Sequence, residues 1–141
     1  MATAAETVDR CPLFASLAPK ARKNLASDLR ERRYSAGDAM TSEDQGGVGF
    51  FVIGEGTAAV HVGGGADPAR TLGPGDVFGE MALITGETRS AAITAQTDVQ
   101  CWVLSQWHFK PLVLDNPELG WALLEILARR VRDTQVRSTN A

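Results

Sequence analysis

The sequence predicts an α+β fold, in which a β-barrel or double-sheet roll of short strands lies between helical segments. Residues 32–105 contain short apolar runs separated by glycine, aspartate and proline, a pattern typical of many short strands. On both sides of this region, apolar residues recur at helical spacing. The 141 residues, of which 44% are hydrophobic, are enough for one domain with one core.

The first part, residues 1–31, is predicted to be helical. Met1–Asp9 is small and polar, and we expect it to be frayed or to form one helical turn. An apolar segment, Cys11–Phe14, follows it. A helix is predicted over Pro19–Arg30, because apolar residues at every fourth position give it one buried face: Leu17, Ala21, Leu25 and Leu29.

The central part, residues 32–105, is predicted to form the roll. Its strand candidates are Gly49–Ile53, Thr57–Val62, Ala69–Leu72, Ala91–Ala95 and Val99–Leu104. The turn signals are Ser35–Asp38, Gly54–Gly56 and Gly73–Asp76. Gly63–Gly65 lies between two strand candidates and does not lead into a helix, so we interpret it as a hairpin tip and not as a phosphate loop.

The last part, residues 106–137, is predicted to contain two helices. The first covers Gln106–Leu114. The second begins just after it, where Asn116 suits the N-cap and Pro117 the first helical position. Its arginines are expected to form a solvated face rather than a nucleic-acid patch. One face of this helix is expected to hold Leu123, Leu127, Val131 and Thr134.

The composition argues against several classes of protein. The chain has 14 basic and 17 acidic side chains, a net charge of −3, which argues against direct nucleic-acid binding. Cys11 and Cys101 form no CxxC pair, so we expect reduced thiols and no structural metal. The N-terminus does not resemble a signal peptide. No apolar run is close to the roughly 18 residues that a membrane span needs, so a cytoplasmic protein is expected. His61 and His108 belong to no recognisable catalytic set, so we expect neither an enzyme nor a cofactor.

One stretch, Gly73–Asp98, has the features of a small-anion site. A helix is predicted to open at Phe78-Gly79-Glu80, where free N–H groups favour an anion and the glycine allows close approach. Arg89 offers a planar fork that matches two phosphate oxygens. Ser90 and Ala91 can add a hydroxyl and N–H donors.

Glu80 narrows the choice of anion. Its carboxylate accepts hydrogen bonds and cannot donate them, so beside an anion it suits a sugar hydroxyl. Arg89 is the single basic residue of Gly73–Asp98 against four acids, which favours a monoanion such as a cyclic phosphodiester. No Walker-type Gly-Lys-Ser/Thr motif is present, so nucleotide hydrolysis is not expected. The alternative is that Arg89 only pairs with Glu80 or Glu87 on a surface.

These residues closely resemble a known motif. The consecutive runs Phe78–Ile84, Thr85–Thr88 and Arg89–Ala91 are similar to the phosphate-binding cassette of cyclic nucleotide-binding domains. That family includes the bacterial cAMP receptor protein, regulatory subunits of cAMP-dependent kinase and cyclic-nucleotide-gated channels. The resemblance extends over roughly Leu13–Thr134. Further positions that fit the family pattern are Pro12–Phe14, the stretch from Glu43 through Phe50–Ile53, Gly56, Val60 and Gly75–Asp76.

The resemblance implies a fold and a ligand site. The fold is a β-roll of about eight strands, similar to a jelly roll, with N-terminal helices, a short cassette helix and C-terminal helices. Arg89 would bind the cyclic phosphate, Glu80 the ribose 2′-OH and Val60 the base. Thr134, which follows a run similar to the bacterial receptor's, would cap the base. The other expected contacts are Gly79, Met81, Ala82, Ser90 and Ala91.

We therefore expect a cyclic nucleotide sensor domain, with cAMP as the favoured ligand and cGMP as the other candidate. No helix-turn-helix, kinase or channel segment is visible, so the output is expected from an unknown protein partner or from a larger protein. A homodimer through the last helix is a further possibility. Two other interpretations stay open: a structural or interaction module that keeps the fold but has lost ligand binding, and an enzyme.

Overall fold

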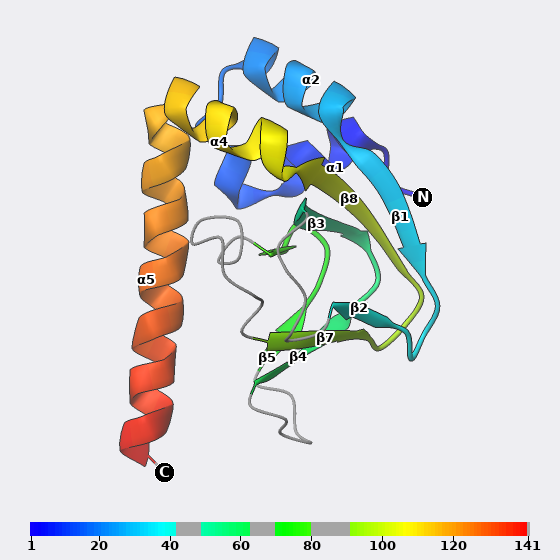
Figure 1. The fold of residues 1–141 in the computed structure, drawn as a ribbon, viewed down its shortest axis with the longest axis vertical. Coiled ribbons are helices and arrows are strands. Elements are labelled where there is room, and N and C mark those ends of the chain that lie inside the picture. Colours follow the sequence, from blue (N-terminus) through cyan, green and yellow to red (C-terminus); the bar gives the residue numbers. More distant parts are fainter. Residues whose placement is uncertain (42–48, 63–69, 80–90, 141) are drawn as a thin grey trace.

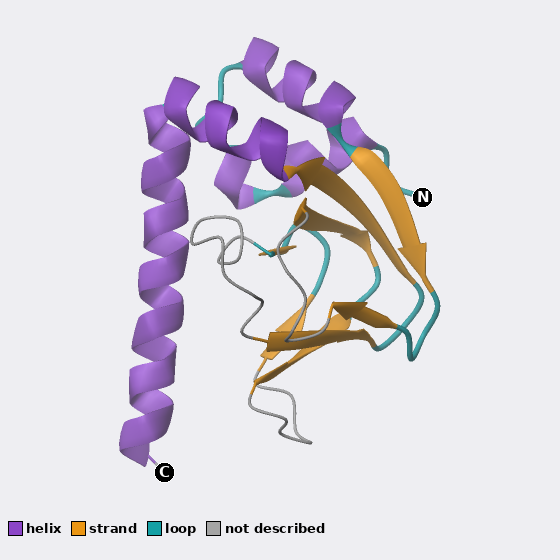
Figure 2. Ribbon diagram, in the orientation of Figure 1, coloured by secondary structure: helices purple, strands orange, loops and turns teal. Residues whose placement is uncertain are grey.

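The computed structural model describes residues 1–41, 49–62, 70–79 and 91–140. Within them, eight strands form two four-stranded antiparallel sheets, which pack together as a β-roll (Figures 1 and 2). One sheet has the strand order β1-β8-β3-β6, and the other has the order β2-β7-β4-β5. The predicted β-roll with helices before and after it is confirmed. The strands are β1 Arg30–Tyr34, β2 Ala39–Thr41, β3 Gly49–Glu55, β4 Ala58–Val62, β5 Arg70–Leu72, β6 Val77–Phe78, β7 Ala91–Ala95 and β8 Val99–Ser105.

The helices occupy two places around the roll. Helices α1 (Ala4–Arg10), α2 (Pro19–Asp28) and α4 (Gln106–Asp115) gather at one end, and the long helix α5 (Pro117–Asn140) runs alongside (Figure 1). Among the described residues, no helix is long and apolar enough to cross a membrane.

The N-terminus is more ordered than its small, polar residues suggest. A capping box starts α1, in which the N–H of Glu6 donates to Thr3 Oγ1 (3.1 Å) and the N–H of Thr3 donates to Glu6 Oε1 (3.2 Å). Val8 anchors the helix in the core with 2% of its surface exposed. The expectation of a frayed or single-turn segment is therefore wrong, because α1 has 7 residues and a buried side.

The predicted helix over Pro19–Arg30 ends earlier than expected. Helix α2 stops at Asp28, Leu29 is buried in extended conformation, and Arg30 pairs with Val103 as the first residue of β1. The last two residues of the predicted helix, Leu29 and Arg30, are therefore extended, because the chain pairs with β8 from Arg30 onward.

Strand β3 contributes side chains to both hydrophobic cores, one under the helices and one between the sheets. Successive side chains of a strand point to opposite faces, so Phe50 packs towards the helices while Phe51 packs between the sheets. The Phe50 ring stacks on Phe109 of α4 with centroids 5.0 Å apart, and the Phe51 ring stacks on Phe78 of β6 at 4.6 Å. Because both faces of β3 are buried, its apolar run is continuous rather than alternating.

Two of the three predicted turns are present, whereas Gly54 and Glu55 of the third continue strand β3 and only Gly56 lies beyond it. The N–H of Asp38 donates to the carbonyl of Ser35 (2.9 Å), and the N–H of Asp76 donates to that of Gly73 (3.0 Å). Strands β4 and β5, which flank the predicted hairpin tip Gly63–Gly65, pair in antiparallel fashion. The tip itself lies outside the described residues.

The two C-terminal helices begin where the sequence predicts. The side-chain amide of Asn116 donates to the carbonyl of Leu112 (2.9 Å), so it closes α4 just before α5 begins at Pro117. The expectation that Leu123 and Val131 share one face is wrong. Leu123 is buried, whereas Val131 is 58% exposed, because two steps of four residues rotate a position about 80° around a helix of 3.6 residues per turn.

Candidate ligand site

The backbone leading to the predicted phosphate-binding segment is fixed by the turn at Gly73–Asp76. The Asp76 carboxylate accepts from the N–H of Gly73 (2.8 Å), which closes the turn. The N–H of Gly75 donates to the carbonyl of Ile53 (2.8 Å), and the N–H of Ile53 donates to the carbonyl of Asp76 (2.9 Å). These bonds attach the turn to β3 in the centre of its sheet.

Strand β6 then leads directly to Gly79. Phe78 is a buried strand residue that stacks on Phe51, so the expectation that Phe78 opens a helix is wrong. Gly79 has φ +92°, in the left-handed region that favours glycine. A glycine is therefore suited to this position for a backbone reason, in addition to the close approach of an anion that the sequence predicts.

Most of the predicted phosphate contacts lie beyond this point. Ala91 is the first residue of β7. The cassette helix is outside the described residues, as are Glu80, Met81, Ala82, Arg89 and Ser90. Their roles remain predictions.

Val60, the predicted base contact, lies in the interior of the roll. It is 4% exposed and belongs to the core between the sheets. On β4 it stands opposite Arg70 of β5 and, on its other side, opposite Ile93 of β7. Because directly opposed residues of antiparallel strands project to the same face, Arg70 leaves β5 on the face that Val60 occupies.

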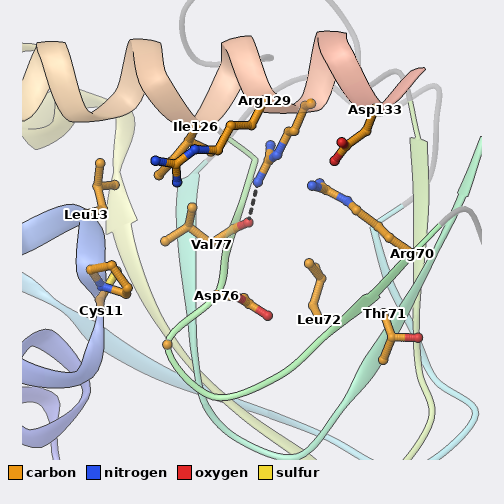
Figure 3. A pocket seen from close by; sticks show the side chains of 13 residues that line it. Cys11, Leu13, Arg70, Thr71, Leu72, Asp76, Val77, Ile126, Arg129 and Asp133 are labelled. Carbon is orange, nitrogen blue, oxygen red and sulfur yellow. Dashed lines mark hydrogen bonds between the residues drawn. The ribbon is translucent and has the colours of Figure 1, made fainter. Parts of the chain in front are cut away.

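A pocket of about 330 Å³ lies between β5, the Gly73–Asp76 turn and α5, with the 3-10 helix η1 (Pro12–Phe14) at one end (Figure 3). Its volume is at the lower end of the range for small-molecule sites. The strand side contributes Arg70, Thr71, Leu72, Asp76 and Val77, and α5 contributes Ile126, Arg129, Arg130 and Asp133.

Arg130 connects α5 to the strand that leads to Gly79. Its Nη2 donates to the carbonyl of Val77 at 3.1 Å, across a sequence separation of 53 residues (Figure 3). Burial, and then the nearby Arg70 guanidinium, lower the pKa of Arg130 to about 10, while Asp76 acts in the opposite direction. This pKa lies well above 7, so Arg130 stays charged at neutral pH and makes a charge-assisted hydrogen bond.

The remaining charged groups frame the pocket. Arg129 pairs with Glu125 of the same helix at 3.6 Å. Figure 3 shows the Asp133 carboxylate pointing from α5 towards the strands and the Arg70 side chain rising from β5 towards α5. Thr134 follows Asp133 in α5, so the predicted cap belongs to the helix that covers this pocket.

Arg70, Arg130 and Asp133 are absent from the sites that the sequence predicts. The sequence carries only an approximate signal for Arg70, because the register that places it opposite Val60 is centred on residue 65, the last position of the glycine run. The other two residues reach the pocket only because α5 lies over β5 and β6.

Within the described ranges, no group of three His, Cys, Asp or Glu side chains could hold a metal ion. Cys11 and Cys101 are free and buried, and burial raises the pKa of their thiols to about 11 and about 12.

The sequence of this chain is similar to a known domain family and to curated proteins. The family model of the cyclic nucleotide-binding domain matches residues 31–116. A cAMP-dependent protein kinase regulatory subunit of Aspergillus niger is 34% identical over 106 residues, which are 75% of this chain and 26% of that protein. The chain thus spans about a quarter of the length of that relative.

Solved structures agree with the sequence relatives. The Thermus thermophilus catabolite activator protein superposes with a TM-score of 0.80 at 29% identity, over 91% of this chain and 62% of the other. A cAMP-bound PfPKA-R superposes with a TM-score of 0.79 at 27% identity, over 93% of this chain and 43% of the other. The match to the family model and the superposition on these structures show that this chain belongs to the cyclic nucleotide-binding domain family.

Proposed function

We propose that this domain is a sensor that binds a cyclic nucleotide, with cAMP as its first candidate ligand, and passes the signal to another protein or to another part of a longer chain. The observation that supports this most directly is the pocket between β5 and α5, which adjoins the strand leading to Gly79. The regulatory subunit and the PfPKA-R structure carry cAMP in their names, which supports cAMP as the ligand here.

In this proposal two cassette residues bind the phosphate and the ribose, and a residue of β4 contacts the base. Arg89 binds the cyclic phosphate, Glu80 accepts from the ribose 2′-OH, and Val60 packs against the base. Additional contacts come from Gly79, Met81, Ala82, Ser90, Ala91 and Thr134. A chain with two such specific polar residues fits a working sensor better than a module that has lost its ligand.

Calorimetric titration with cAMP and cGMP tests this function. Arg89→Ala is expected to weaken binding of both nucleotides by about 1.5–3 kcal/mol, since it removes a charged hydrogen-bond donor from the phosphate. Arg132→Ala is the matched control, because Arg132 is exposed on α5 and does not line the pocket. A wild-type chain that binds neither nucleotide would instead support the structural module, and an unchanged affinity of Arg89→Ala would refute the phosphate role.

A homodimer through α5 is the second part of the proposal. Trp121, Leu124 and Val131 are 66%, 58% and 58% exposed. Their spacing of three and then seven residues is that of a heptad seam, which buries its apolar side chains against a second helix. The exposed positions belong to a different face of α5 from the buried Leu119 and Leu123.

Sedimentation velocity checks this interface. Leu124→Glu is expected to shift the wild-type dimer to a monomer, because it places a charge in the seam. Leu114→Glu is the control, since Leu114 is also exposed, at 68%, but lies on α4. A monomeric wild-type protein, or equal effects of both variants, would exclude the seam.

A further inference from the structure

We propose that Ser35 is a phosphorylation site for an arginine-directed serine kinase, and that its phosphate loosens the turn between β1 and β2. The phosphoryl group comes from ATP. The Ser35 hydroxyl oxygen forms a bond to the γ-phosphorus, the bond from that phosphorus to the departing ADP oxygen breaks, and the hydroxyl proton passes to a base of the kinase. The site is independent of the proposed ligand, because it lies on the turn after β1, away from the pocket between β5 and α5.

The sequence around Ser35 has the charge pattern that such kinases select. Two arginines stand three and two residues before the serine, in the run Arg32-Arg33-Tyr34-Ser35. Guanidinium groups at these positions suit acidic side chains in the substrate groove of a kinase, since kinases choose their substrates partly by charge. Of all serine and threonine residues in the sequence, Ser35 alone has arginines at both positions.

The structure presents this run in an accessible, extended form. Arg32 and Arg33 belong to β1, which stands at the end of its sheet and on the rim of the roll (Figure 1). Both arginines are exposed, and so is Ser35, which directly follows the strand. Arg33 pairs with Glu31 at 3.1 Å, but an exposed pair of this kind is weak, so a kinase carboxylate can replace Glu31. A kinase can therefore reach the serine and both arginines without unfolding the sheet.

The neighbours of Ser35 determine what its phosphate does. The N–H of Ser35 donates to Asp38 Oδ2 (2.8 Å), and the N–H of Ala36 donates to Asp98 Oδ1 (3.0 Å). Two carboxylates thus hold the turn, and a phosphoserine adds a charge of about −1.5 to −2 beside them. Repulsion between these like charges weakens both hydrogen bonds.

The same turn holds the end of β7. The N–H of Gly37 donates to the carbonyl of Ala95 (2.8 Å), and the N–H of Ala95 donates to the carbonyl of Asp38 (2.9 Å). A phosphate on Ser35 therefore loosens the junction of β1, β2 and β7, which belong to both sheets of the roll.

Treatment of the full chain with a purified arginine-directed serine kinase, Mg²⁺ and ATP tests the site. Peptide mass spectrometry is expected to find the phosphate on Ser35, and not on Ser27, which is also exposed but has no arginine at either position. Arg32→Ala and Arg33→Ala should each lower the rate about tenfold, because each removes a charged contact with the kinase. Arg30→Ala is the matched control, since Arg30 is an exposed arginine of the same strand outside the recognised positions, and it should react like wild type.

Two comparisons show whether the folded domain is the substrate. A synthetic peptide of residues 30–38 carries the same run without the fold. If it reacts and the full chain does not, the site in the folded protein is refuted, and if the peptide itself does not react, the motif is refuted. Leu119→Ala removes a buried side chain far along the chain and should lower stability, yet it should react at the wild-type rate. A faster reaction of this variant would show that only unfolded chains are phosphorylated, which also contradicts the site.

Hydrogen-exchange mass spectrometry tests the effect on the turn. The phosphorylated chain is expected to exchange faster than the unmodified chain at residues 35–39 and 93–97, and equally fast in α5. Equal exchange of the two forms at the turn would overturn the proposed loosening. None of these measurements uses a nucleotide ligand of the domain, so a negative result leaves the sensor function as it stands.

Discussion

At Gly56, between β3 and β4, both the backbone conformation and the surrounding atoms favour a residue without a side chain. Its φ is +90°, and a Cβ added there would collide with the carbonyl oxygen of Asp98 and lie 3.0 Å from Thr97 Oγ1. Gly37 has a similar φ of +91° but open space around it. Gly73 has neither constraint, since its φ is ordinary and nothing lies within 4 Å.

These three glycines form a matched series. Gly56→Ala is expected to lower the free energy of unfolding by about 2–4 kcal/mol, because strain and collision add. Gly37→Ala should cost about 1 kcal/mol from strain alone, and Gly73→Ala should be neutral or slightly stabilising. Urea unfolding measures the order, and equal losses for Gly56→Ala and Gly37→Ala would contradict the collision.

At the scale of elements, the contact between α5 and β6 determines how the pocket is covered. Arg130 makes this contact through the Val77 carbonyl, while Arg129 pairs with Glu125 inside the helix. Because Val77 lies two residues before Gly79, this hydrogen bond joins α5 to the strand that leads to the predicted cassette.

Arg130→Met should loosen α5 on the roll. Losing a charge-assisted hydrogen bond worth about 1.5 kcal/mol corresponds to about tenfold faster amide exchange in the helix around residues 126–133. Arg129→Met is the control, because it removes only the pair within α5. Hydrogen-exchange mass spectrometry compares the two variants, and equal exchange in both would show that the contact with Val77 does not hold the helix.

For the whole molecule, the two cysteines report on the two cores. Cys11 lies in the core under the helices, and Cys101 lies between the sheets. Burial raises the pKa of both thiols well above 8, so little thiolate is present at that pH and reagents have no access to it.

Thiol labelling then tests whether both cores unfold together. At pH 8, Cys11→Ala and Cys101→Ala, each with one thiol left, are expected to react with an aromatic disulfide reagent only through global unfolding, and with the same dependence on urea. Rapid labelling of the thiol that remains in Cys101→Ala, without urea, would show instead that the helical core opens alone.

The sequence by itself determined those features that depend on local patterns. Strands β3, β4, β5, β7 and β8 follow from apolar runs and turn residues, and α5 starts at Pro117, since proline suits the first position of a helix. The spacing of Gly79, Glu80 and Arg89 predicted the ligand class for the same reason, since the motif is contiguous.

Only the tertiary structure decided the rest. Four of the five residues of β1 are exposed, so no apolar pattern marks that strand, and pairing with β8 creates it. Arg70 and Asp133 line one pocket because α5 runs alongside the roll and Arg130 bonds it to β6. Contacts of this kind depend on hydrogen bonds and packing between segments that are distant in the sequence, and local periodicity does not reveal which segments pair.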